Sequence, residues 1–490
     1  MLANIKQTVR HTAYYGLGNL APKLIGFVLL PLYTKLITVA DYGILGLLEL
    51  VGLLSVHVLS MGMPHALLRW RGLANTERQR RQQTFSALVF LAAGVGTTLA
   101  IILPLRNSLA DFLFHQPMGS YIILLALFVT FSVLNKVPLT IMRSEEKSTA
   151  YAMTIAAQFT VNLLANIYFV AIAKLGIEGI LISQAISSAA VFFILLPYLG
   201  RRIHFSLDLS ELKQMVRFGG PLIFAALAIS VLNWGDRYIL SELATFKEVG
   251  LYTLGYKFSN VMKMLLVDAF ALGLPTIGWR IVKEETNPQR FFSKTLTYLA
   301  FSLLWCGLAL SIYGKGIIHL LALDKTYWGA DVVVPVLVLS IVFAGMQTVL
   351  FFLLQIPRKT QYIAFIIGGA AAVNVGLNLL WIPRMGIMGA AWATLVTQVG
   401  SLFLSYRTVQ RVYPVRYELK RIGILFTVAL ALFAVSTLFN HYLIWQRVLF
   451  KALLLLSFPV ILYLAKFYDP VELNRMKGSA QKWRRKLGFH

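Results

Sequence analysis

The dominant pattern in this sequence is a run of about 20 apolar residues that recurs every 30 to 40 residues or so from one end to the other. A run of that length crosses a hydrocarbon layer of about 30 Å as an α-helix. The runs therefore predict an all-α polytopic membrane protein. Fourteen spanning helices are expected, near residues 12–36, 42–64, 84–105, 120–142, 150–174, 178–200, 215–241, 249–276, 291–313, 329–355, 361–382, 386–408, 419–440 and 444–467.

Composition supports this class. The chain has 490 residues, of which 58% are hydrophobic and 13% charged, with a mean hydropathy of +0.72. Soluble domains lie well outside that range. Pro22 and Lys23 sit at the centre of the first run, where no signal-peptide cleavage pattern follows, so we expect this run to remain as the first helix. The single cysteine, Cys306, cannot build a disulfide framework or a thiolate metal cluster, and we expect neither metal nor cofactor.

The basic residues predict the orientation. Most of the 45 Lys and Arg residues fall in segments on the side that holds both termini, including "RWRGLANTERQRR" and the tail after the last run. Basic residues gather in cytoplasmic segments, so both termini are expected in the cytoplasm. The net charge of +25 is then a topology signal and an attraction to anionic lipid, not a nucleic-acid footprint.

The second half of the sequence repeats the first at an offset of roughly 207 to 212 residues. "KLITVADYGIL" matches "ELATFKEVGLY", "GMPHALLR" matches "GLPTIGWR", "NLLAN" matches "NVGLN" and "LGIEG" matches "MGIMG". Two six-helix repeats of the same orientation place a substrate cavity between two bundles. The expected organisation is an N-terminal lobe (1–200), a cytoplasmic linker (201–214), a C-terminal lobe (215–412), two further helices (413–468) and a basic cytoplasmic tail (469–490).

Charged residues lie inside the apolar runs. Such a residue costs roughly 2.5–3.5 kcal/mol at mid-membrane, so it needs a partner, water or a ligand. The basic residues are Lys23, Lys136, Arg237, Lys257 and Lys263, and the acidic ones are Glu49, Asp236 and Asp268. Cations are in surplus, which favours a watery cavity or an anionic ligand. There are two alternatives to a role at a cavity. Lys136 or Asp236 could form an ion pair that only holds helices together, and the side chains of Lys23 and Lys263 could extend to the membrane–water interface.

Helical spacing groups these residues. Tyr15, Asn19 and Lys23 form one polar stripe, and Tyr252, Tyr256, Asn260 and Lys263 form another. Asp236 and Arg237 are neighbours in sequence, so each is expected to find its partner elsewhere.

The chain resembles a polysaccharide flippase of the multidrug/oligosaccharidyl-lipid/polysaccharide exporter superfamily. The segments "PLYTKLITVADYGILGLL", "GGPLIFAALAISVLNWGDRYILSEL" and "MGIMGAAWAT" carry the resemblance. It implies a V-shaped bundle of two six-helix lobes with two extra helices. It also implies a non-enzymatic function: flipping of a lipid-linked oligosaccharide across the bacterial inner membrane by alternating access, in the biosynthesis of O-antigen, lipopolysaccharide or another surface polysaccharide.

With that substrate in view, we predict a cationic lining for its diphosphate, with polar side chains for its sugar hydroxyls. The lining residues are Lys23, Arg237, Lys257, Lys263, Asn19, Tyr256 and Asn260. Arg69 and Arg280, which follow Pro64 and Pro275, are expected at the cytoplasmic mouth, either as substrate contacts or as plain topology anchors. Glu49, Asp236 and Asp268 are the candidates for ion coupling.

Other functions compete. A lipid II flippase or a cation/drug antiporter of the same superfamily would share the fold, but an antiporter for organic cations favours a carboxylate-lined cavity. A membrane glycan polymerase or glycosyltransferase would need a convergent catalytic group, and the sequence offers no carboxylate pair, metal motif or nucleophile elbow. The expected partners are the lipid-linked oligosaccharide, membrane lipids and a polysaccharide polymerase or chain-length regulator. No nucleic acid is expected, and the protein is expected to be monomeric.

Overall fold

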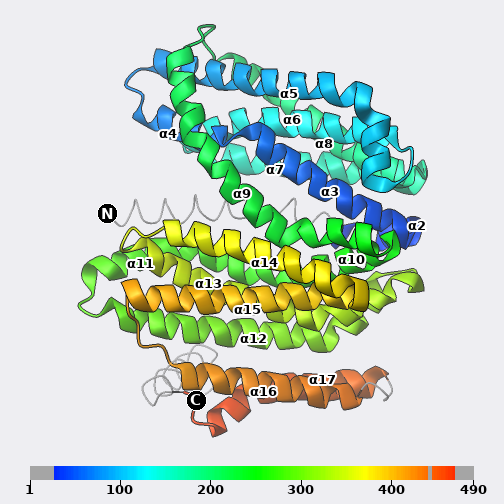
Figure 1. The fold of residues 1–490 in the computed structure, drawn as a ribbon, viewed down its shortest axis with the longest axis vertical. Helices are drawn as coiled ribbons and strands as arrows, with labels where there is room; N and C mark the ends of the chain where they lie inside the picture. The colour runs from blue at the N-terminus through cyan, green and yellow to red at the C-terminus, as the bar shows by residue number, and fades with distance from the viewer. Residues whose placement is uncertain (1–26, 440–443, 469–490) are drawn as a thin grey trace, which may run out of the picture. The chain divides into compact units, whose positions relative to one another are not determined.

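The computed structural model describes residues 27–439 and 444–468, and every regular element in these ranges is helical (Figure 1). The α-helices of the first half are α2 (Leu30–Leu36), α3 (Val39–Ser60), α4 (Met63–Leu73), α5 (Glu77–Phe114), α6 (Gly119–Ser144), α7 (Ser148–Asn166), α8 (Gly176–Gly200) and α9 (Leu209–Leu243). Those of the second half are α10 (Phe246–Met262), α11 (Ala269–Glu284), α12 (Pro288–Leu321), α13 (Val334–Gln355), α14 (Gln361–Met385), α15 (Ile387–Val412), α16 (Leu419–Leu438) and α17 (Ile444–Leu464). Two π-helical segments, η1 (Ile167–Ile172) and η2 (Lys263–Asp268), and a 3-10 segment, η3 (Lys325–Val333), complete the order.

The membrane-spanning pattern is confirmed. Within the ranges described, twelve helices are long and apolar enough to cross a membrane, or thirteen when the two halves of α9, bent by 42°, count as one span. These segments correspond one by one to the predicted runs from 42–64 to 444–467. The remaining predicted run, 12–36, lies mostly outside the described residues. Its last residues form α2 (Leu30–Leu36).

Side-chain caps fix where several helices begin. The Thr38 hydroxyl accepts a hydrogen bond from the Asp41 N–H at the start of α3, and Thr76 accepts one from Gln79 at the start of α5. The Asp208 carboxylate accepts one from the Glu211 N–H at the start of α9. Each cap satisfies an N–H group that has no partner within the helix.

The described chain forms two compact units. The first takes in the chain up to Phe258 with Ile318–Val333 and Gln361–Ser401. In it α6 packs against both α5 and α8, α7 packs against α8, and α9 runs along α14 (Figure 1). In the second unit α11 packs against α13, and α16 pairs with α17. These units divide the chain differently from the lobes expected at 1–200 and 215–412, and those lobe boundaries stay a prediction.

Equivalent glycines of the two repeats meet at the crossing of α3 and α10. A Cβ atom on Gly43 would overlap the Phe246 carbonyl oxygen, and one on Gly250 would overlap the Val39 carbonyl oxygen. Val39 and Phe246 are separated by the same offset as the two glycines. The contact is therefore reciprocal, as expected when two copies of one motif pack face to face, and only glycine allows so close an approach.

Two more pairs of matched motifs share their local geometry. The Asn166 amide donates to the carbonyl oxygen of Asn162 at 2.8 Å, and the Asn378 amide donates to that of Asn374 at 2.9 Å. At the matched turns "LGIEG" and "MGIMG", the second residue is a glycine with positive φ, +56° and +54°. These geometries confirm the internal repeat.

The two proline turns behave differently. In the first, Met61 and Gly62 adopt left-handed conformations, and Pro64 stands in the first turn of α4, so the chain breaks between α3 and α4. In the second, Pro275 lies inside α11, which continues to Glu284, and the irregularity is the π-helical segment η2 upstream. The helix is therefore interrupted next to Pro64 and continues through Pro275.

Candidate functional site

The site begins with an ion pair between sequence neighbours on α9. Arg237 Nη1 lies 2.8 Å from Asp236 Oδ1, and the two side chains are 0% and 1% exposed. The same nitrogen donates to the carbonyl oxygen of Asn233 at 3.2 Å. The expectation that adjacent residues must pair elsewhere was wrong, because the long arginine side chain folds back along its own helix and reaches the carboxylate beside it.

Aromatic rings enclose the guanidinium group. The Arg237 Cζ lies 4.4 Å from the ring centre of Trp234 and 4.3 Å from that of Tyr256. The Tyr252 hydroxyl donates to Asp236 Oδ2, so the carboxylate is held from two sides. Cation–π contacts of this kind are strongest where water is excluded.

The guanidinium nevertheless has a free edge. Its Nε and Nη2 atoms are buried and have no hydrogen-bond partner among the residues that the structure describes. A buried donor without a partner costs about 1–3 kcal/mol, and more when it is charged. Arg237 is thus a buried cation that still has donors to offer.

A second ion pair joins α10 to α3 in the same unit. Lys257 Nζ lies 2.8 Å from Glu49 Oε1, and it also lies 5.1 Å from the ring centre of Tyr42. Both side chains are mostly buried. Two of the predicted lining cations are therefore paired with two of the predicted ion-coupling carboxylates.

The other predicted lining residues are spread over the chain. Lys23 and Asn19 lie outside the described residues. Asn260 and Lys263 belong to the second compact unit, as does Asp268, the third candidate for ion coupling; Lys263 and Asp268 are the ends of η2. Asn260 Oδ1 is buried with no hydrogen-bond partner in the described part of the chain.

The two arginines predicted at the mouth are both exposed. The Arg69 guanidinium stacks 4.7 Å above the Phe218 ring and 5.5 Å from the Trp70 ring. Arg280 lies near the end of α11, in the other unit.

Some charged and aromatic groups were missed or differ from expectation. Lys136 has no ion pair with any described residue, so the structural pairing considered for it is not observed. Lys451 is a further embedded cation: it is 7% exposed, and its Nζ donates to the Ile312 carbonyl oxygen at 3.1 Å. Trp234 was also missed, although its three-residue spacing from Arg237 places both on one helix face.

A separate charge cluster surrounds Glu145, just after α6 ends. Its carboxylate lies 3.2 Å from Arg71 Nη2, 2.6 Å from Lys147 Nζ and 2.8 Å from Arg202 Nε. Partial burial acts to raise the pKa of Glu145, but the hydrogen bonds and charges of Arg202 and Lys147 outweigh it and lower that pKa to about 2. The cluster ties the end of α6 to the chain that follows α8.

Together, the apolar spans, the internal repeat and the ion pairs buried among helices define a polytopic helical membrane protein. Residues 8–279, more than half of the chain, match the family model described as "Polysaccharide biosynthesis protein", and the chain belongs to that family. This match confirms the resemblance to a polysaccharide family that was stated from the sequence.

Solved structures show the same fold at low identity. A lipid II flippase MurJ in an inward closed conformation is 12% identical, with a TM-score of 0.77 over 95% of this chain and 100% of that one. A multidrug resistance MATE family transporter in an inward-facing conformation is 13% identical, with a TM-score of 0.66 over 80% and 95%. The Vibrio cholerae MATE transporter VcmN in the bent form is 15% identical, with a TM-score of 0.56 over 83% and 97%. No curated protein matches the sequence.

Proposed function

We propose that this protein translocates a lipid-linked oligosaccharide, carried on undecaprenyl diphosphate, across the bacterial inner membrane for the biosynthesis of a cell-surface polysaccharide such as O-antigen. The two repeats would alternate access to the substrate, with both chain termini in the cytoplasm. Membership of the polysaccharide biosynthesis family and the fold shared with a lipid II flippase support this class of function.

The observation that carries the proposal is the buried Arg237 with two unsatisfied donors. A guanidinium group binds phosphate oxygens in a bidentate manner, and the Nε–Nη2 edge is free for that geometry while Nη1 holds Asp236. In the conformation described here the site is closed. Opening of the helices around α9 would let a diphosphate reach that edge without first breaking the Asp236 pair.

Lys257 would act differently. Its charge is held by Glu49, so a diphosphate would have to compete with a carboxylate for it. Such competition would act as a switch. Glu49 neutralises the charge of Lys257 when the substrate is absent, and the diphosphate takes the place of Glu49 when the substrate is bound. Glu49, released from the pair, could then take up a proton or another cation, which makes this pair the better candidate for ion coupling.

The test compares Arg237→Lys with Arg237→Ala in cells whose own flippase is replaced by each variant at equal abundance. Lysine keeps the positive charge but lacks the paired N–H donors of the guanidinium group, so we expect partial export with Arg237→Lys. With Arg237→Ala, undecaprenyl-linked oligosaccharide should remain on the cytoplasmic side. Full export by Arg237→Ala would remove the phosphate contact from the proposal and leave Arg237 as a packing residue.

A lipid II flippase is the second candidate, because the MurJ structure covers all but a small part of this chain. Rescue of cells depleted of their lipid II flippase would favour it. A drug antiporter is less well supported, because Glu49 and Asp236 are both occupied by cations and offer no free carboxylate to an organic cation.

A further inference from the structure

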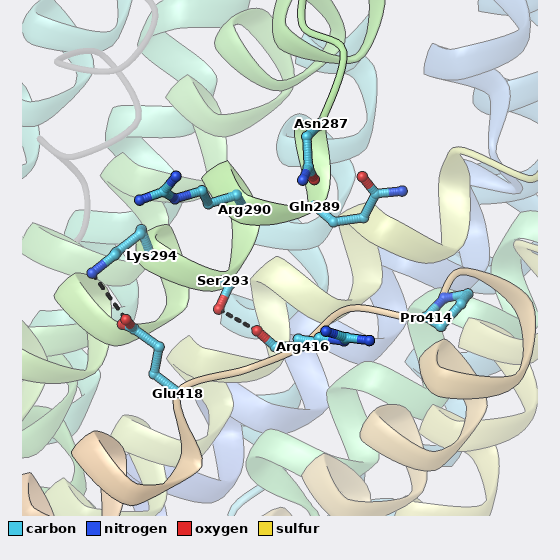
Figure 2. A pocket seen from close by; sticks show the side chains of 8 residues that line it. All are labelled: Asn287, Gln289, Arg290, Ser293, Lys294, Pro414, Arg416 and Glu418. Atoms are coloured by element: carbon cyan, nitrogen blue, oxygen red, sulfur yellow. Dashed lines mark hydrogen bonds and ion pairs between the residues drawn. The ribbon is translucent and has the colours of Figure 1, made fainter.

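A polar pocket lies where two spanning helices of the second unit begin. It has a volume of about 500 Å³. Figure 2 shows that one wall comes from the start of α12 and the other from the connection between α15 and α16. The lining residues are Asn287, Gln289, Arg290, Ser293, Lys294, Pro414, Arg416 and Glu418.

Hydrogen bonds hold the two walls together. The Ser293 hydroxyl donates to the Arg416 carbonyl oxygen at 2.7 Å, and the Thr297 hydroxyl donates to Glu418 at 2.9 Å (Figure 2 draws the first of these). The side chain of Gln410 bonds both the N–H and the carbonyl oxygen of Val415, a buried residue of the same connection. The pocket is therefore a fixed feature of the fold and not an accidental gap between loops.

The charge of the pocket is positive. Glu418, the only carboxylate among the described residues that line it, is already engaged by Lys294 at 2.9 Å and by Arg421 at 3.1 Å. Arg290 and Arg416 are exposed, and neither forms an ion pair with another described residue. Their guanidinium groups point away from each other in Figure 2, and both stand on long, exposed side chains that can turn toward the pocket. Two uncompensated guanidinium groups on such side chains favour an anion in the pocket that both can contact after turning.

The position of the pocket indicates the kind of anion. The spanning helices α12 and α16 begin at Pro288 and Leu419, so the pocket lies at the ends of two such helices, where we expect hydrocarbon to give way to polar groups. Both helices point their N-termini, the positive ends of their dipoles, toward this level. Both segments are also among those predicted to face the cytoplasm, where anionic lipids are enriched.

We propose that this pocket binds the phosphate headgroup of an anionic phospholipid, with the Arg290 and Arg416 guanidinium groups on the phosphate oxygens. The bound lipid bridges the start of α12 to the start of α16 within the second unit. A phosphate ester could also come from a soluble anion or from an isoprenoid diphosphate, so the test separates these sources. The inference does not depend on the proposed transport function.

The test uses the full chain purified in detergent, with short-chain phosphatidylglycerol titrated against its thermal stability. The pocket variant carries Arg290→Gln and Arg416→Gln. The matched control carries Lys283→Gln and Lys420→Gln, which removes the same charge from exposed positions nearby that do not line the pocket. We expect the pocket variant to bind phosphatidylglycerol at least about tenfold more weakly, from the loss of two charge-assisted contacts, and the control to bind as the unmodified protein does.

Equal weakening in the two variants would mean attraction by surface charge alone and would overturn the proposal. Inorganic phosphate that stabilises the protein at the same concentration as phosphatidylglycerol would make the site one for a soluble anion. Farnesyl diphosphate that displaces phosphatidylglycerol at lower concentration would reassign it to a diphosphate lipid. Phosphatidylcholine should give little stabilisation, because its headgroup carries a compensating cation.

Discussion

Arg237 is paired with Asp236, the residue directly before it on α9, through a contact of 2.8 Å that is closed to solvent. The ring of Trp234, on the same helix, and that of Tyr256, on α10, cover the guanidinium group. Both partners of this ion pair lie on α9, and the Tyr252 hydroxyl of α10 adds a hydrogen bond to the Asp236 carboxylate. Because the Asp236 carboxylate neutralises the Arg237 guanidinium group, a membrane-spanning helix can hold this buried cation.

Removing the carboxylate should destabilise the fold. Asp236→Asn keeps the shape of the side chain but leaves the Arg237 cation buried without its counter-charge, which typically costs about 3–5 kcal/mol. We expect a lower Tm and a lower folded yield. Asp111→Asn, at an exposed position of α5, is the control and should leave both unchanged. A stable Asp236→Asn protein would show that the carboxylate is dispensable for folding and is kept for transport.

The Lys257 and Glu49 pair should show strong coupling in a double-mutant cycle. Lys257→Met and Glu49→Gln each leave one partner without its counter-charge, whereas the double variant removes both charges. We expect the double variant to be more stable than the sum of the single effects predicts, by roughly 0.5–3 kcal/mol. Transport should be lost in every variant that lacks Lys257. Additive effects on Tm would contradict a pair that matters for stability.

The reciprocal glycine contact gives a packing prediction. Gly43→Ala puts a methyl group against the backbone of α10, which cannot yield as a side chain can, so we expect a loss of about 1–3 kcal/mol in stability. Gly250→Ala should behave in the same way. Gly72→Ala is the control, because a methyl group there meets no atom within 4 Å. The test is the Tm of each of the three variants, measured in detergent. Equal Tm values for Gly43→Ala and Gly72→Ala would contradict the close contact at Gly43.

The Glu145 cluster predicts a pH dependence. The pKa of Glu145 is lowered from 4.5 to about 2 in the folded protein. The contribution of this carboxylate to stability is therefore present in full above about pH 4.5 and is lost as the pH falls toward 2. The Tm difference between the native protein and Glu145→Gln should be constant near neutral pH and shrink on acidification through that window. A difference that grows on acidification would have the wrong sign for this carboxylate.

The orientation gives a topological prediction. A reporter fused after Gly200 or after His490 should be cytoplasmic, and one placed in the 315–327 segment should be outside, because basic residues concentrate on the side of the first two positions. A tail on the outside would overturn the predicted orientation.

The sequence predicted the fold far better than the site. Hydropathy alone locates the spanning helices, since every backbone group in a bilayer must be satisfied within a helix. Matched glycines and asparagines reveal the repeat because the same local geometry requires the same residue types. Side-chain partners are different: the Lys257 and Glu49 pair joins residues on separate helices, and no spacing rule could have supplied it. Helical spacing could have predicted the contact between Arg237 and Trp234, because residues three apart share a helix face. It could not have predicted that the arginine side chain folds back to pair with Asp236.

The most direct test of the central claim is a flipping measurement with the purified full chain in sealed vesicles. An undecaprenyl-diphosphate-linked oligosaccharide is confined to one leaflet, and its arrival in the other is followed with a membrane-impermeant glycan-binding probe. We expect transfer with the unmodified protein to be much faster than in protein-free vesicles, reduced by Arg237→Lys and lost with Arg237→Ala, while the matched change Arg411→Ala on the exposed surface leaves it intact. Transfer at the protein-free rate with the folded, unmodified chain would contradict the account.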